Sequence, residues 1–275
     1  MDQLHEKYEA LLAELRSYGG VAVAFSGGVD STLLLRAAHD ALGDRALAVT
    51  AASEAFPMRE TEAAARFCRA NGIRQETFRF DALDLAQFRD NPPDRCYHCK
   101  KAIFGKIFEI AAENGLRVVA EGSNTDDAGD YRPGMRAIRE LGAKSPLKAA
   151  GLGKEEIRAL SREMLLPTAG KPSLACLASR FPYGEPITAE MLEAVEEAER
   201  FLLGLGLTQV RVRAHGRLAR IEALPEHFSL LLEKRGEITE MLKNFGFSYV
   251  SMDLTGYRTG SMNEALPAAE RSRKE

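Results

Sequence analysis

The segment 26–31 reads SGGVDS and joins an apolar run, VAVAF at 21–25, to a helix expected over 31–42. A strand, a glycine turn and a helix in this order aim free backbone N–H groups and the helix dipole at one point, which makes an anion site. Gly27 and Gly28 let the backbone approach a phosphate closely, and Ser26 and Ser31 add hydroxyl donors. The segment matches neither GxxxxGK[ST] nor GxGxxG. We interpret it as a phosphate loop rather than as a turn that only joins strand to helix.

A second polar segment, GSNTDDAGDYRPG at 122–134, follows a strand expected over 116–122. It therefore falls at the carboxyl edge of the predicted sheet, where α/β proteins bind ligands. Asp126, Asp127 and Asp130 place three carboxylates within five residues, and they repel each other unless a cation or a hydrogen-bond donor offsets them. Because Mg²⁺ prefers oxygen ligands, we favour a magnesium site here, chiefly at Asp126 and Asp127, over a solvated loop.

Three of the four cysteines are candidates for metal or sulfur chemistry. Cys96 and Cys99 form a Cys-x-x-Cys pair just before a helix expected over 100–113, and Cys176 lies in a long loop. Structural zinc, with His98 or Cys68 as a fourth ligand, competes with a cluster, and a redox pair is disfavoured because no thioredoxin-like unit surrounds the pair. Three thiolates on a [4Fe–4S] cluster would leave one iron open for an exchangeable ligand such as sulfide. Cys68 itself is better explained as a small buried hydrophobe inside a helix at 58–71.

Arg211 and Arg213 are two apart on an expected strand, so their side chains point to the same face. Two guanidinium groups there can bind phosphate or carboxylate oxygens in a forked manner. A ladder of arginines that pair with nearby acids is an equally good interpretation of the pattern. Arg180, Tyr257 and Arg258 are weaker candidates for a binding role.

The elements that must position these residues alternate between strand and helix. Strands are expected at 21–25, 46–51, 77–80 and 116–122, and helices at 2–18, 31–42, 58–71 and 100–113. This order predicts an α/β fold with a doubly wound, mostly parallel sheet and right-handed crossovers.

The rhythm changes after a Pro-, Gly- and Ser-rich loop at 167–186. A helix at 188–203, a hairpin of strands at 208–215 and 217–224, a helix at 226–244 and a strand at 247–254 predict a smaller α+β domain. We expect one domain over 1–167, the cysteine-bearing loop over 168–186, a second domain for substrate binding or oligomerisation over 187–266, and a disordered tail over 267–275.

Composition limits the class of protein. The 275 residues carry 37 basic and 40 acidic side chains, a net charge of −3, and 45% are hydrophobic, which excludes a disordered or collagen-like chain. No apolar run approaches the ~20 residues that span a bilayer, and four cysteines are too few for a disulfide scaffold. We expect a cytoplasmic protein without a membrane partner, and the slightly acidic balance makes a nucleic-acid partner unlikely in our prediction.

Two of these motifs carry a resemblance. SGGVDS and the 122–134 segment resemble the PP-loop ATP pyrophosphatases, whose fold is of the adenine nucleotide alpha hydrolase type. These enzymes cleave ATP to AMP and pyrophosphate while they adenylate a substrate oxygen. The resemblance implies that ATP binds at a set of loop residues, with Mg²⁺ beside them: Ser26, Gly27, Gly28, Asp30, Ser31, Asn124 and Arg180.

The chain up to about residue 263 resembles the LarE family, which inserts sulfur during synthesis of the nickel-pincer nucleotide cofactor of lactate racemase. CLASRFPYG at 176–184 carries this most specifically, supported by RVR at 211–213 and DLTGYRTGSMN at 253–263. The resemblance implies ATP-dependent conversion of pyridinium-3,5-biscarboxylic acid mononucleotide to the bisthiocarboxylic acid mononucleotide, with Arg211, Arg213, Tyr257 and Arg258 on the substrate. It also implies a homo-oligomer and a separate sulfur donor.

Within that family, one branch uses a single cysteine, matched by Cys176, that gives up its own sulfur. This chain also has Cys96 and Cys99, so it resembles the branch whose three cysteines hold a [4Fe–4S] cluster. Cys176 is then the expected catalytic residue either as sulfur source or as cluster ligand. A tRNA thiolase, an ammonia-using amide ligase and a nucleotide-binding protein with structural zinc are the competing interpretations.

Overall fold

A computed structural model describes residues 3–129, 133–172, 175–258 and 260–261. Its first sheet has the strand order β3-β2-β1-β4, and all its neighbours are parallel. The strands are β1 (Val21–Ala24), β2 (Ala46–Ala52), β3 (Arg74–Arg79) and β4 (Val119–Ala120). The predicted parallel α/β sheet is confirmed. The tail at 267–275 lies outside the described residues, and the domain boundaries stay predictions.

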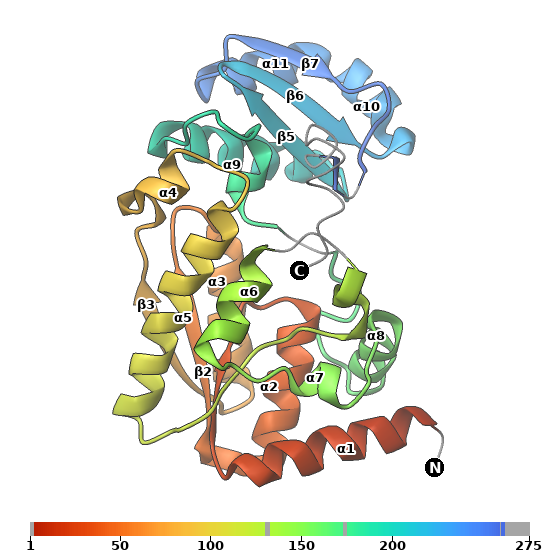
Figure 1. Cartoon of the computed structure of the whole chain (residues 1–275). Helices are drawn as coiled ribbons and strands as arrows, with labels where there is room; N and C mark the ends of the chain where they lie inside the picture. The colour runs from red at the N-terminus through yellow and green to blue at the C-terminus, as the bar shows by residue number, and fades with distance from the viewer. Residues whose placement is uncertain (1–2, 130–132, 173–174, 259, 262–275) are drawn as a thin grey trace.

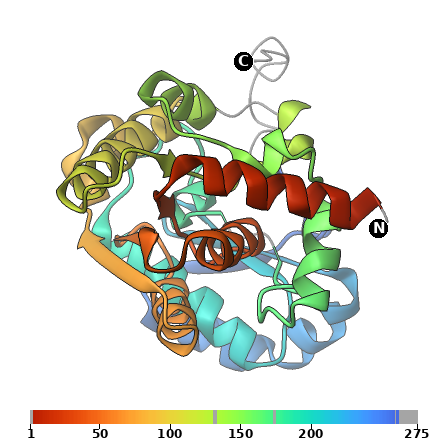
Figure 2. The same ribbon diagram turned by 90° about the horizontal axis from the view of Figure 1, so that it is seen from below.

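Successive residues of the central strands enter two different apolar clusters. Val21 and Val23 pack with α1 (Gln3–Tyr18), α2 (Val29–Leu42), α3 (Met58–Ala70) and α8 (Lys154–Glu163), whereas Ala22 packs with α5 (Arg95–Glu113). Helices therefore cover both faces of the sheet, as the view from below shows for α3 and α5 (Figure 2). This double burial explains why the strands are apolar without alternation.

The second sheet has the order β5-β6-β7 and lies beyond the carboxyl edge of the first sheet (Figure 1). β5 (Val210–His215) and β6 (Leu218–Ala223) form the predicted antiparallel hairpin, which turns at Gly216 with φ 55°. β7 (Tyr249–Met252) runs parallel to β6. The helices of this part are α9 (Ala189–Gly204), α10 (Phe228–Glu233) and α11 (Arg235–Asn244), so the predicted α-β-β-α-β order is confirmed.

Several boundaries differ from the predictions. The helix expected over 226–244 is a 3₁₀ turn (Pro225–His227) and two helices that meet at Lys234. The strand expected over 116–122 keeps only two residues in the ladder with β1. The same stretch also pairs with Lys144, whose N–H donates to the Val119 carbonyl at 2.8 Å.

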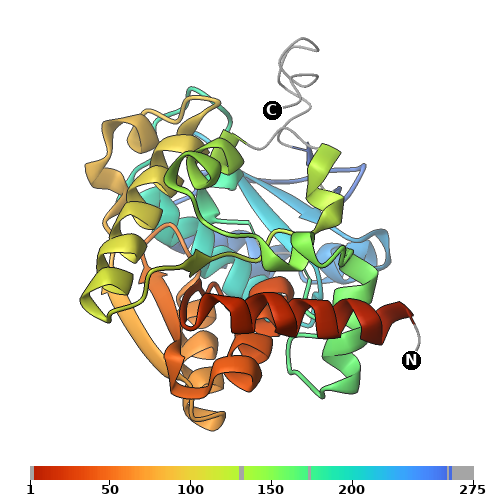
Figure 3. The ribbon, with the colours of Figure 1, turned by 60° about the horizontal axis from the view of Figure 1, so that its bottom comes forward.

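Four helices were not predicted: α4 (Ala86–Arg89), α6 (Pro133–Leu141), α7 (Pro146–Ala149) and α8. α6 packs alongside α5 in both views (Figures 1 and 3). None of the helices built from the described residues is long and apolar enough to cross a membrane.

Candidate active site

The phosphate loop leaves β1 and enters α2 as predicted. Gly27 has φ 71°, a conformation that favours glycine. α2 begins at Val29, two residues earlier than expected, and no side chain caps its first N–H groups. Those groups have no acceptor within the helix, so the helix start offers donors to an anion. The Ser26 and Ser31 hydroxyls lie 3.1 Å apart beside them.

Asp30 points away from these donors toward two neighbours. Its carboxylate accepts hydrogen bonds from Asn124 Nδ2 at 3.2 Å and from Lys154 Nζ at 2.5 Å. The Gly122 backbone approaches the same turn so closely that an added Cβ would lie 3.0 Å from the Ser31 nitrogen. The loop after β4 is thus fitted directly against the phosphate loop, and it contributes the predicted Asn124.

Asp126 and Asp127 have structural partners. An Asp126 oxygen accepts from the Lys154 N–H at 2.7 Å, which caps the start of α8, and an Asp127 oxygen accepts from the Asn124 N–H at 2.9 Å. Asp130 lies outside the described residues. Within the described part of the chain, no three His, Cys, Asp or Glu side chains are arranged to hold one ion. Magnesium binding by this loop stays a prediction.

The Cys-x-x-Cys pair lies inside α5 and not before it, which corrects the expected helix start at 100. α5 begins at Arg95, so Cys96 and Cys99 occupy its first turn, three residues apart, and share one face. The helix begins this early because Asp94 and Arg95 already form the turn bonds, the Arg95 N–H donating to Pro92 and the Tyr97 N–H to Asp94.

Cys176 completes a group of three thiols. Burial, and next the charge of Cys176, raise the pKa of Cys96 and of Cys99, which places the three sulfur atoms within electrostatic reach of one another. Cys68 lies on α3 in the other apolar cluster, where burial raises its pKa to about 12. Cys68 is therefore a core residue, as predicted, and its position excludes it as a fourth ligand beside Cys96 and Cys99.

The buried Arg180 guanidinium holds the backbone around Cys176. Arg180 donates to the Ala175 carbonyl at 2.8 Å and to the Cys176 carbonyl at 3.0 Å, and it forms an ion pair with Glu199. The next residue, Leu177, donates its N–H to the Ala55 carbonyl, just beyond β2. Arg180 is thus wholly buried and holds the backbone of the cysteine loop. Its predicted contact with ATP stays a prediction.

The arginine pair of β5 is buried. Arg213 donates to Glu222 at 2.8 Å and to the Ser179 carbonyl at 2.7 Å. It therefore pairs with an acid, as in the alternative interpretation of the arginine pattern. The Arg211 guanidinium lies 5.4 Å from the centre of the Tyr257 ring. Arg258 lies 3.9 Å from Asp253. Arg213 thus contacts the cysteine loop at Ser179, and contact of these four candidates with substrate stays a prediction.

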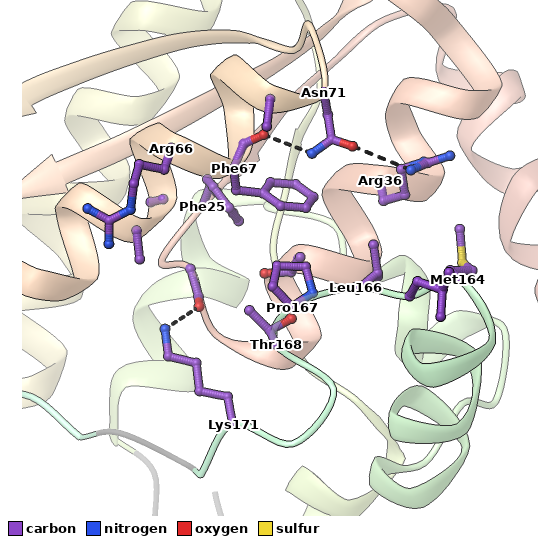
Figure 4. Close-up of a pocket in the computed structure, with 16 residues that line it drawn as sticks. Phe25, Arg36, Arg66, Phe67, Asn71, Met164, Leu166, Pro167, Thr168 and Lys171 are labelled. Carbon is purple, nitrogen blue, oxygen red and sulfur yellow. Dashed lines mark hydrogen bonds between the residues drawn. The ribbon is translucent and has the colours of Figure 1, made fainter.

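Three charged residues at the site were not predicted. Lys154 reaches Asp30, and Lys171 reaches both the Gly27 carbonyl, at 2.8 Å, and Glu60. Figure 4 shows the bond between Lys171 and the loop. The amphipathic pattern KEEIRALSRE would have predicted α8 and placed Lys154 at its start. No local pattern marks Lys171, because its partners lie more than a hundred positions away.

A further unpredicted pair, Asn91 and Arg95, connects the start of α5 to the end of the linker, as we call the cysteine-bearing loop at 168–186. Asn91 has φ 55° and donates from Nδ2 to the carbonyls of Pro182 and Glu185. Arg95, buried in the first turn of α5, bonds Asn91 and lies 4.9 Å from the centre of the Tyr183 ring. The turn that carries Cys96 is thereby joined to the loop that carries Cys176.

Known proteins are similar to this chain in sequence, several of them over most of its length. The asparagine synthase family matches residues 8–107, which include the phosphate loop. An uncharacterised protein of Synechocystis, slr1717, is 41% identical over 94% of this chain and 98% of its own length. An uncharacterised protein of Methanocaldococcus jannaschii, MJ0830, is 28% identical over 87% of this chain and 91% of its own.

A third relative has a named activity. The pyridinium-3,5-bisthiocarboxylic acid mononucleotide synthase of Lactiplantibacillus plantarum is 38% identical to this chain over 98% of each sequence. Similarity of this extent covers the phosphate loop, the cysteine linker and the second sheet together. The chain therefore belongs to the family of that synthase, the LarE family of PP-loop proteins.

Proposed function

We propose that this protein is an ATP-dependent sulfurtransferase that converts pyridinium-3,5-biscarboxylic acid mononucleotide to the bisthiocarboxylic acid mononucleotide, a step of nickel-pincer cofactor synthesis for lactate racemase. The observation that carries the proposal is the placement of the phosphate loop and the three cysteines at one edge of the first sheet. Contacts link them: Gly122 lies against Ser31, and the start of α6 lies against Cys96, where a Cβ on Gly134 would lie 3.3 Å from the Cys96 carbonyl oxygen.

The first chemical step activates the substrate carboxylate, which is a poor acyl donor. A substrate carboxylate oxygen attacks the α-phosphorus of ATP, the bond to pyrophosphate breaks, and a mixed anhydride with AMP forms. The N–H groups at the start of α2 and the Ser26 and Ser31 hydroxyls are placed to bind the departing pyrophosphate. Lys154 adds a cation next to Asp30.

The second step replaces AMP by sulfur. A sulfur nucleophile attacks the activated carbonyl carbon, the bond to AMP breaks, and a thiocarboxylate remains. Arg180 and Leu177 fix the main chain on both sides of Cys176, so the sulfur is presented at a constant position relative to the end of β2.

We infer that Cys96, Cys99 and Cys176 would hold an iron–sulfur cluster rather than a single ion, around which no three such side chains of the described residues are arranged. Cys96, Cys99 and Cys176 bring three thiols together, and thiolates are the usual ligands of such clusters. A [4Fe–4S] cluster held there would supply an open iron for an exchangeable sulfide.

The test combines product analysis with metal analysis. Protein purified without oxygen is given ATP, Mg²⁺, the biscarboxylic acid mononucleotide and sulfide; AMP, pyrophosphate and a product 16 mass units heavier per exchanged oxygen are expected. Absence of both AMP and thiocarboxylate would contradict the proposal. Iron and acid-labile sulfide near four per chain, lost in Cys176→Ala and retained in Cys68→Ala, would support the cluster; zinc or no metal would instead support Cys176 as the sulfur source.

A further inference from the structure

Lys171 contacts the phosphate loop from the linker that carries Cys176. Its ammonium donates to the Gly27 carbonyl at 2.8 Å (Figure 4). It also forms an ion pair with Glu60 of α3. Only 19% of the side chain is exposed, so the contact is shielded from water. The loop has no lysine of its own, and this cation is brought to it from 144 positions along the chain.

The peptide geometry gives this contact a direction. The Gly27 carbonyl and the Gly28 N–H belong to one peptide unit, and no described peptide is cis. In a trans peptide these two groups point in opposite directions. The Gly28 N–H therefore points away from Lys171, through the loop to its other side. A cation on the carbonyl also polarises the peptide, which strengthens the N–H as a donor.

The backbone of Lys171 is itself held in place. Arg158 of α8 donates to the Ala169 carbonyl at 2.7 Å and to the Lys171 carbonyl at 2.8 Å. Five residues further on, Arg180 holds the Cys176 carbonyl. The linker is thus attached at one end to the phosphate loop and at the other end beneath the cysteine.

We propose that Lys171 is a positioning residue for the ATP step: it holds the Gly27–Gly28 peptide with its N–H directed at the departing pyrophosphate. Glu60 neutralises the lysine and keeps it in place. The inference rests on the proposed function for its role in turnover, but the loop's affinity for pyrophosphate can be measured without any turnover.

The experiment compares Lys171→Met, Lys171→Arg and the matched control Lys148→Met. Lys148 is exposed on α7, away from the loop residues named above. Pyrophosphate binding is measured by calorimetry, and kcat and KM for ATP by release of pyrophosphate. Thermal unfolding of each variant shows whether it is folded.

For Lys171→Met we expect pyrophosphate affinity and kcat each to fall about tenfold, less than the ~100-fold loss for a direct oxyanion donor, because Lys171 acts through a peptide. Lys171→Arg, which still donates to the carbonyl, should recover most of both losses, and Lys148→Met should match the parent. A folded Lys171→Met protein with unchanged pyrophosphate affinity and kcat would overturn the proposal. If the parent binds pyrophosphate but never releases it from ATP, the proposed function fails while the affinity comparison still decides the role of Lys171.

Discussion

The Arg180 guanidinium and the Glu199 carboxylate form two parallel hydrogen bonds, each 2.8 Å long, and their side chains are 0% and 2% exposed. Glu199 lies on α9 and also accepts the Val212 N–H of β5 at 3.1 Å. One carboxylate therefore connects the cysteine linker, a helix and the second sheet. Forked pairs of this kind combine charge with fixed geometry.

Removal of this carboxylate should strongly destabilise the protein. Glu199→Ala leaves the buried Arg180 charge without its partner, and we expect the free energy of unfolding to fall by about 3–5 kcal/mol. The control is Glu197→Ala, on the same helix, whose partner Arg200 is 66% exposed and whose loss should cost at most about 1 kcal/mol. Equal losses of unfolding free energy in the two variants, measured by urea unfolding, would show that the buried pair stabilises the fold no more than the exposed pair.

The same pair predicts how stability depends on pH. Burial alone would raise the pKa of Glu199, but Arg180, Arg211 and the Val212 N–H together outweigh burial, and the pKa lies below its ordinary value. A carboxyl with a lowered folded-state pKa stabilises the fold above its unfolded pKa of ~4.3, and that contribution is lost as pH falls through the folded pKa. The stability difference between the parent and Glu199→Gln should thus be largest near pH 7 and shrink below pH ~4. A difference that stays constant from pH 7 to pH 3 would contradict this assignment.

The fit of Gly122 against the phosphate loop can be tested by one methyl group. In Gly122→Ala the new carbon would lie 3.0 Å from the Ser31 nitrogen and 3.2 Å from the Asp30 Cβ, so the loop must shift. Overpacking costs about 1–3 kcal/mol, which we expect to appear as a roughly tenfold weaker affinity for ATP.

The matched control for that substitution lies in α5. Gly105→Ala places its methyl group where no atom lies within 4 Å. It should leave ATP affinity unchanged and stabilise the helix by about 0.5–1 kcal/mol. Equal ATP affinities in the two variants would show that Gly122 is not needed for the shape of the loop.

Cys68 should be chemically silent. Its pKa of about 12 and its burial on the core face of α3 leave almost no accessible thiolate at neutral pH. Brief treatment of the native, metal-free protein with iodoacetamide at pH 7.5, followed by peptide mass mapping, should find Cys176 modified and Cys68 unmodified. Modification of Cys68 at a comparable rate would mean that α3 opens readily.

Local patterns in the sequence predict the first sheet and the phosphate loop well. The local sequence, VAVAF followed by SGGVDS, is almost sufficient to predict both the strand and the helix start after it. The same holds for the glycines after α3 and α5: Gly72 and Gly115 have φ values of 65° and 67°, a conformation that favours glycine after a helix.

Long-range partners could not be predicted in the same way. Arg213 could bind an anion or an acid on its pattern alone, and only the pairing of β5 with β6 brings Glu222 to it. Asp126 could bind a cation, but the start of α8 offers it a backbone N–H instead. Lys171 has no local signal, because its role depends on the loop at 26–31 being folded beside it.

Because Cys96 and Cys99 lie in a helix, the number of residues between them sets the angle between their side chains around the α5 axis more than the distance between them. Each residue advances around the α5 axis by about 100°, so two intervening residues bring the sulfurs back to one side. Deletion of one of the two intervening residues would set the sulfurs about 200° apart, on opposite sides of the helix, although the chain would shorten by only ~1.5 Å. A flexible loop would tolerate such a deletion, and this helix does not.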